Sequence, residues 1–251
     1  MRLQTRRGFG REALGSLLTF SLLDTLFAAD AWADEIKPVT AHWLAEVNSL
    51  AADVKSQQLK QIEWHTKIED LFSRVDLPDL LRLIDFEKLT KNLELLDRGA
   101  RSVRFEFPKV DGLPTELVFG KQIFAMKKGR SVVPHGHNNM ATAFLILRGE
   151  CHGRHYDRLE DHEDHFIIKP TIDRKFAAAE YSTVSDYKDN IHWFEAQSEP
   201  AFIFNIHVLD IRPGSDLPTG RVYLDPDGER LAGGLIKAPR VGYKEINKRY
   251  A

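Results

Sequence analysis

The sequence has a single cysteine, at position 151, so no disulfide can form within the chain. One thiol also excludes a metal site built from several cysteines. Basic and acidic residues nearly balance, 35 against 37, and this near-neutral charge gives no reason to expect nucleic acid as a partner. The sequence contains neither a Gly-rich phosphate loop nor a G-x-S-x-G motif. The ten histidines are therefore the richest source of site chemistry.

The composition is that of a globular chain. Apolar residues make up 43% of the sequence and charged residues 29%, which is typical of a protein with a buried core. The 251 residues suit one domain of ordinary size together with an extension.

The first 33 residues have the three parts of an export signal. Arg6 and Arg7 precede an apolar run over residues 13–27, and Ala33 ends an A-x-A site. With Phe9 two positions on, the arginine pair resembles a twin-arginine signal. The resemblance implies cleavage after Ala33, passage of the folded chain through the twin-arginine translocase, and a periplasmic location. The alternative is an amphipathic first helix of the fold. No stable membrane insertion of the mature chain is expected, because the run is too short to span.

Residues 34–99 are predicted to form a helical N-terminal segment. Its apolar positions step by three and four residues, at Trp43, Val47, Leu50 and Val54. Pro78 and Asp85 stand where two further helices would begin, and Gly99 is expected to end the last one. Packing of the stripe onto the rest of the chain is favoured over a coiled coil, since the repeat is short.

Residues 100–251 are predicted to be mainly β, with a C-terminal tail. Segments with period-two alternation are separated by turn signals and not by helices, which favours an antiparallel sandwich or barrel. The alternating segments lie at residues 103–107, 116–119, 122–126, 142–148, 165–168 and 202–209.

Two histidines share one face of a predicted strand. His135 and His137 are separated by one residue, so both imidazoles project to the same side, as half of a metal site would require. Gly129 stands before the pair and Gly149 after it. The whole resembles the first cupin motif, G-x5-H-x-H-x3,4-E-x6-G, and His192 stands where the second cupin motif brings one more ligand. The resemblance implies a cupin-type double-stranded β-helix (jelly-roll) barrel and a metal held by His135, His137 and His192.

One position departs from the cupin motif. The usual glutamate would fall at Thr142, which is a poor metal ligand. Three neutral imidazoles would leave the charge of a divalent ion uncompensated, which favours a small anionic substrate as an additional ligand. Open coordination positions would admit a bidentate substrate and O2. Fe(II) is the favoured metal, and Zn, Mn, Ni or Cu would suit the same imidazoles.

The three-histidine pattern without the glutamate resembles the thiol dioxygenases, of which cysteine dioxygenase is the familiar member. That family carries a further histidine fifteen residues after the third ligand, and His207 stands fifteen after His192. The resemblance implies that His207 is catalytic, as an acid or base; the alternative is a hydrogen-bonded barrel histidine. Asn205 and Leu209 replace the serine and tyrosine of the family's relay.

The anion-binding group is harder to place. Arg101, Arg104 and Lys109 lie in the region of the family's carboxylate-binding arginine but form no motif. Arg154 and Tyr156 alternate on one face of the strand after Gly149, and they are predicted to bind the substrate if that face lines the barrel mouth. The alternative is a solvated outer face. The acidic segment 161–165 is expected to be a loop and not a second metal site.

Three functions follow from these residues. The first is a periplasmic mononuclear non-haem Fe(II) dioxygenase acting on a thiol- or carboxylate-bearing small molecule. The second is a Zn- or Mn-dependent isomerase, lyase or hydrolase. The third is a ligand-binding or sensor protein, whose helical segment would expose an apolar face. Resemblance to cupins also implies a homodimer.

Overall fold

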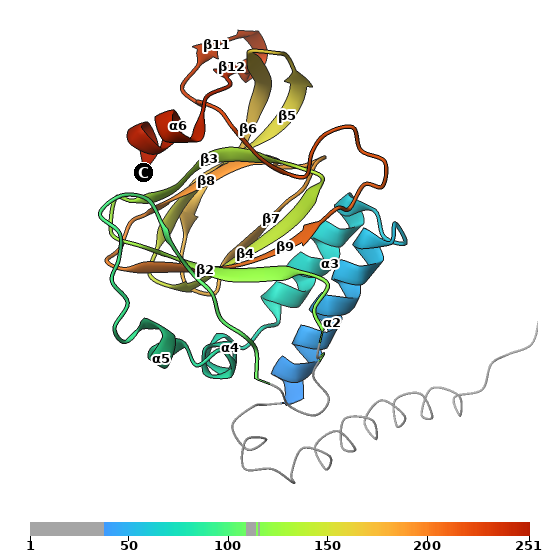
Figure 1. Cartoon of the computed structure of the whole chain (residues 1–251), viewed down its shortest axis with the longest axis vertical. Helices are drawn as coiled ribbons and strands as arrows, with labels where there is room; N and C mark the ends of the chain where they lie inside the picture. Colours follow the sequence, from blue (N-terminus) through green and yellow to red (C-terminus); the bar gives the residue numbers. More distant parts are fainter. Residues whose placement is uncertain (1–37, 109–113, 115) are drawn as a thin grey trace, which may run out of the picture.

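The computed structural model describes residues 38–108, 114 and 116–251. In it the chain forms a barrel of two antiparallel sheets with the N-terminal helices on one side (Figure 1). The five-stranded sheet has the order β1-β2-β9-β4-β7, and the seven-stranded sheet the order β10-β3-β8-β5-β6-β12-β11. The strands are β1 (Arg101–Val103), β2 (Gly120–Met126), β3 (Ser131–Asn138), β4 (Met140–Arg148), β5 (Cys151–Asp161), β6 (His165–Phe176), β7 (Tyr181–Val184), β8 (Ile191–Ala196), β9 (Ala201–Leu209), β10 (Gly220–Tyr223), β11 (Glu229–Arg230) and β12 (Ile236–Pro239). The helices are α2 (Pro38–Lys55), α3 (Gln61–Ser73), α4 (Leu77–Leu83), α5 (Phe86–Thr90), the short 3-10 turn η1 (Ala232–Gly234) and α6 (Tyr243–Tyr250).

The strand order identifies the barrel type. Strands β2 to β9 alternate between the sheets except for the hairpin β5–β6, and they lie in the orders β2-β9-β4-β7 and β3-β8-β5-β6. The first strand of the eight thus pairs with the last and the second with the seventh, which is the order of a jelly roll, or double-stranded β-helix. The predicted fold class, a mainly β barrel of this type with an N-terminal helical extension, is confirmed.

The helices α2 and α3 cover the outer face of the five-stranded sheet (Figure 1), and one hydrophobic cluster joins the two layers. Trp43 packs against Phe72 of α3, with ring centroids 5.5 Å apart, and against Phe204 of β9, at 6.5 Å. Its indole Nε1–H donates to the Leu71 carbonyl, at 3.1 Å. The apolar stripe of α2 is therefore buried against the barrel, as expected for packing and not for a coiled-coil seam.

Two local predictions were wrong. The last of the four N-terminal helices ends at Thr90, and Gly99 (φ +71°) lies in a turn before β1. Of the first predicted strand, residues 103–107, only Val103 is paired, at the end of β1, and residues 116–119 form no strand. Phe105 and Phe107 instead pack ring against ring, with centroids 5.3 Å apart, so their alternation reflects burial without a pairing partner.

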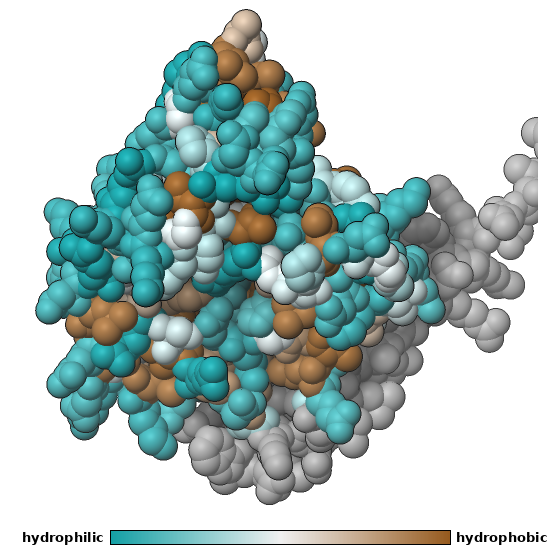
Figure 2. Space-filling view, turned by 45° about the horizontal axis from the view of Figure 1, so that its top comes forward, coloured by the Kyte–Doolittle hydropathy of each residue, from teal (hydrophilic) through white to brown (hydrophobic). Residues whose placement is uncertain are grey.

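The export signal predicted at residues 1–33 lies outside the described residues. In the part of the chain that is described, no helix has the length and apolar character to cross a membrane. On the face shown in Figure 2, hydrophilic side chains predominate and hydrophobic ones form separate patches.

A buried histidine ties α3 to the barrel. His65 is 1% exposed, and its Nδ1 lies 2.6 Å from the hydroxyl of Thr183 in β7. That hydroxyl donates to the Glu69 carboxylate, which can only accept, so His65 Nδ1–H must donate to Thr183. Burial, and then the charge of Lys188, lowers the pKa of His65 from 6.5 to about 3. The folded protein therefore holds this imidazole neutral.

We expect His65 to make the protein sensitive to acid. Between pH 6.5 and about 3 the unfolded chain binds a proton at His65 that the folded chain does not. The free energy of unfolding should therefore fall as pH falls, by about 1.4 kcal/mol per pH unit from this group. The amide introduced by His65→Asn can still donate to Thr183 but binds no proton. In this variant the slope of the unfolding free energy against pH should be smaller by the contribution of about one proton. Urea denaturation at a series of pH values measures it, and an unchanged slope would contradict the assignment.

Candidate metal centre

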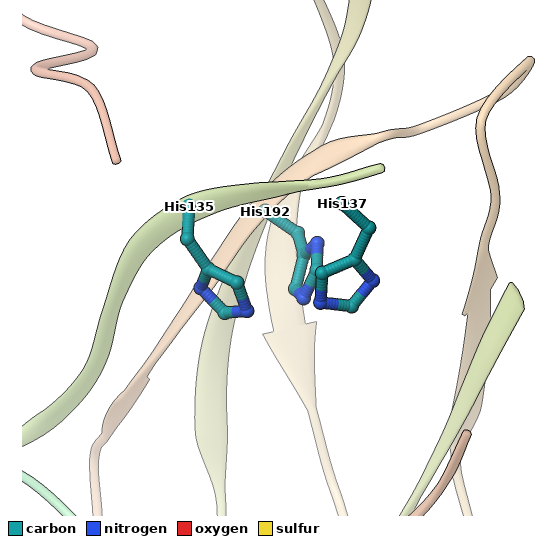
Figure 3. A group of neighbouring side chains, drawn as sticks. All are labelled: His135, His137 and His192. Carbon is teal, nitrogen blue, oxygen red and sulfur yellow. The ribbon is translucent and has the colours of Figure 1, made fainter. Parts of the chain in front are cut away.

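Two adjacent strands carry the three predicted ligands. His135 and His137 lie on β3, and His192 on β8 stands directly opposite His135 in the antiparallel pair. All three imidazoles extend from the seven-stranded sheet toward the barrel interior (Figure 3). Gly136 separates the first two, and a methyl group there would come within 2.7 Å of Asn190 Oδ1. Glycine at this position therefore leaves room for the Ile191 and Asn190 side chains.

The three rings form a compact buried group. His135 is 1% exposed, His137 2% and His192 0%. Their ring centroids lie 4.3 to 5.0 Å apart, and one nitrogen from each ring lies within 4.8 Å of the others. In the described part of the chain this is the one group of three or more potential ligands that meets this spacing.

The outer nitrogen of each ring is held by a hydrogen bond. Nδ1 of His135 lies 2.7 Å from the Val133 carbonyl, and Nδ1 of His192 lies 3.1 Å from the Asn190 carbonyl. A carbonyl only accepts, so each of these Nδ1 atoms carries the hydrogen and each Nε2 keeps its lone pair. Nε2 of all three histidines is buried and has no hydrogen-bond partner. Three buried Nε2 atoms without a hydrogen-bond partner in one place, those of His135 and His192 with the lone pair free, fit a metal ion.

Electrostatics keeps these imidazoles neutral. Burial is the main cause that lowers the pKa of each ring, to about 3 for His192 and well below the usual range for His135 and His137. The guanidinium of Arg221 in β10 lowers all three further. Neutral imidazoles are the form that binds metals. No carboxylate accompanies them, so they would leave the charge of a divalent ion uncompensated.

Thr142, at the position of the glutamate in the cupin motif, contacts His137, one of the three predicted ligands. It lies on β4, in the opposite sheet, and its hydroxyl stands 3.2 Å from His137 Nδ1. The residue is 2% exposed. Thr142 therefore contacts the outer nitrogen of His137 and adds no charge to the group of three histidines.

A cavity of about 220 Å³ opens beside the histidines, between β2 and β9 on one side and β3 on the other. His135 and His137 line it together with His207, the predicted catalytic residue. Arg221 lies at the same cavity, and it has no ion pair with a described residue. The structure thus brings His207 and the three predicted ligands to one place.

His207 reaches the cavity from the opposite sheet. Its β9 position pairs with Thr142 on one side and Gly120 on the other. Its Nδ1 lies 3.4 Å from Asn205 Oδ1, which also accepts from Gln122 Nε2 at 3.2 Å. Burial, and then Arg221, lowers the pKa of His207. A neutral imidazole with one nitrogen directed to Asn205 can hold or accept a proton at Nε2; the catalytic role itself stays a prediction.

We expect Gly120→Ala to displace His207 without loss of the metal ligands. A methyl group at Gly120 would overlap the His207 imidazole. The overlap should cost about 1–3 kcal/mol of stability. Gly242→Ala, at a position with open space, is the matched control and should change little. Metal content and urea denaturation test both variants; loss of metal from Gly120→Ala would show that the change spreads beyond His207.

The structure does not bring Arg154 and Tyr156 to the histidine cavity. They flank His155 on β5, and because His155 is 0% exposed and faces the interior, its neighbours face outward. Arg154 stacks over Trp193, 4.5 Å from its ring centroid, and both predicted residues line a separate cavity with Tyr250. The prediction that this face lines the barrel mouth is therefore corrected to the outer-face alternative.

Sequence reasoning missed two residues of the site. His155 lies inside the barrel, with its ring centroid 6.0 Å from that of His192; strand alternation places it on the face opposite Arg154 but does not tell which face is buried. Arg221 had no local signal, because it reaches the cavity only through pairing of β10 with β3 opposite His137.

The acidic segment 161–165 forms the end of the long β5–β6 hairpin. His162 contacts Glu160 at 2.9 Å and His165 contacts Asp164 at 2.6 Å. These are exposed pairs, and no second three-ligand group is present among the residues that the structure describes. The position of this segment at the end of the hairpin fits the prediction that it forms a loop.

Comparison with known proteins finds solved structures that are similar to part of this chain. The sequence matches no protein-family model and no curated protein. Among solved structures, procruciferin, the 11S globulin of Brassica napus, has 11% identity and a TM-score of 0.30 over 38% of this chain, which spans only 21% of that one. A cupin superfamily protein of Desulfitobacterium hafniense has 16% identity over 47% of this chain and 84% of that one (TM-score 0.31). Oxalate oxidase in complex with glycolate has 12% identity over 54% and 61% (TM-score 0.37). The strand order of the barrel itself establishes the fold class.

Proposed function

We propose that this protein is a mononuclear metal-binding barrel that acts as a non-haem Fe(II) dioxygenase on a small anionic substrate bearing a thiol or a carboxylate. The observation that carries the proposal is the set of three buried Nε2 atoms that have no hydrogen-bond partner and, among the described residues, no accompanying carboxylate. Such a neutral ligand set leaves a divalent ion cationic, so an anionic substrate is attracted as a further ligand.

The residues of the candidate site would have separate roles. His135, His137 and His192 would hold the metal, which when bound would supply redox chemistry toward O2. The apolar wall of the cavity, which includes Phe124 and Phe144, limits the access of water. His207, held through Asn205, is placed to take or return a proton at Nε2.

The test combines metal analysis with spectroscopy. Protein reconstituted anaerobically with Fe(II) should hold about one equivalent, and its nitric oxide adduct should give the EPR signal of a mononuclear Fe(II) centre. Oxygen uptake should follow addition of a small thiol or β-diketone from a panel. Less than about a tenth of an equivalent of any transition metal would remove the metal function altogether.

The non-redox alternative rests on the same ligands. Three neutral imidazoles suit Zn or Mn as well, and these ions would polarise a carbonyl for an isomerase, lyase or hydrolase without O2. Turnover that persists under strict anaerobiosis with Zn restored would favour this function. The sensor alternative predicts an exposed apolar face on the helices, whereas the stripe that includes Trp43 and Val47 is buried.

The cellular setting belongs to the same proposal. The Arg6-Arg7 pair and the A-x-A site at Ala33 support export of the folded chain through the twin-arginine translocase to the periplasm. A homodimer, which the resemblance to cupins implies, also stays a proposal.

A further inference from the structure

We infer that the ligand of the histidine cavity is a small organic anion without an ammonium group, so that α-amino acids are excluded, and that Arg221 enforces this choice. The inference rests on the proposed function for the identity of the site, and it goes further by naming the substrate class. It follows from the charges and the acceptors that line the cavity.

The charges that line the cavity are of one sign. No aspartate or glutamate is found among the described residues of its wall, whereas Arg221 is one of them. An ammonium group would therefore meet a guanidinium and a bound cation with no counter-charge.

The neutral acceptors of the wall are already engaged. Gln122 Oε1 accepts from Ser102 at 2.6 Å, and Asn205 Oδ1 accepts from Gln122 at 3.2 Å. The Thr219 hydroxyl accepts from Asn139 at 3.0 Å and donates to Asp210. Apart from His207 Nε2 and the Thr142 hydroxyl, the wall leaves no free side-chain acceptor for the three N–H donors of an ammonium group, and neither of these two carries a negative charge to pair with it.

The remaining wall is apolar and the space is small. Phe124, Met140 and Leu209 face the cavity, whose volume of about 220 Å³ lies below the roughly 300–1,000 Å³ of sites for drug-sized ligands. A short aliphatic or sulfur-bearing chain fits this wall, with its carboxylate toward Arg221, a residue that has no competing ion pair with a described residue.

Two pairs of ligands that differ only in the ammonium group test the inference: 3-mercaptopropionate against cysteine, and succinate against aspartate. Each is titrated anaerobically by calorimetry into the metal-loaded and into the metal-free protein. The amine-free member of at least one pair should bind at least about tenfold tighter than its amino-acid partner. Equal affinities, tighter binding of the amino acids, or no binding of any of the four would overturn the inference.

Substitutions at Arg221 identify the residue responsible. Arg221→Gln should weaken binding of the amine-free anions by about tenfold, and Arg221→Glu should remove the preference over the amino acids. Arg230→Gln, an exposed arginine at a different cavity, is the matched control and should bind as the unchanged protein does. An unchanged preference in Arg221→Glu would show that this residue does not set specificity.

The two proposals fail in different ways. Metal binding without discrimination overturns the substrate class and leaves the metal centre standing. Absence of metal binding overturns the proposed function, and the titrations of the metal-free protein still decide the role of Arg221, because its charge is present without the ion.

Discussion

His192→Ala is expected to lower bound metal from about one equivalent to below about a tenth. His192 stands opposite His135 across the β3–β8 pair, and its loss removes one of the three buried Nε2 atoms that would bind the metal. The remaining two imidazoles form an incomplete site. Metal analysis after anaerobic reconstitution and dialysis measures the loss.

Thermal unfolding provides an independent readout of the same variant. Metal that binds only the folded state raises the free energy of unfolding by about 2.7 kcal/mol at one hundred times its Kd. Added metal should therefore raise the Tm of the unchanged protein and leave that of His192→Ala where it was. His207→Gln is the matched control, since His207 lies in the opposite sheet, and it should keep both the metal and the shift. Equal metal retention by both variants would refute the ligand assignment.

Trp43→Ala is expected to lower the free energy of unfolding by about 3–5 kcal/mol. The indole is 4% exposed, packs between Phe72 and Phe204, and donates to the Leu71 carbonyl. Its removal leaves a cavity between the helices and the five-stranded sheet, and the Leu71 carbonyl keeps only its hydrogen bond from the Arg74 N–H. Urea denaturation followed by circular dichroism and by intrinsic fluorescence measures the change.

The same measurement decides whether the helical segment and the barrel unfold together. Because one hydrophobic cluster spans both, helix and barrel signals should shift to lower urea in a single transition. Ile62→Ala, at a position of α3 that is 47% exposed, is the matched control and should stay within about 0.5 kcal/mol of the unchanged protein. Separate transitions would mean that the helices are an independent unit.

The helices matter to the site because of strand alternation. In β9, Phe204 and Ile206 face the helices, while Asn205 and His207 face the cavity. In β4, Ala143 faces the helices and Thr142 the cavity. The helical layer thus covers the sheet whose other face carries the side chains that approach the three histidines.

Much of this arrangement could be predicted from local pattern. The i, i+2 spacing of His135 and His137 places both on one face wherever the strand lies, and the resemblance to cupin motifs adds His192. The three- and four-residue steps that begin at Trp43 likewise predict a helix with one buried stripe. These features depend on residues that are close in sequence, so they can be recognised without knowledge of the fold.

The sequence by itself predicted the barrel class, the helical layer and the three histidines of the candidate metal centre, because each follows from short-range periodicity or from resemblance to a motif. Only the tertiary structure decided which face of β5 points inward, and hence that His155 and not Arg154 lies in the barrel. It alone brought Arg221 to the cavity, through pairing of β10 with β3. The physical reason is that period two tells which residues share a face, whereas the choice of buried face and the pairing of distant strands depend on the packing of the whole chain.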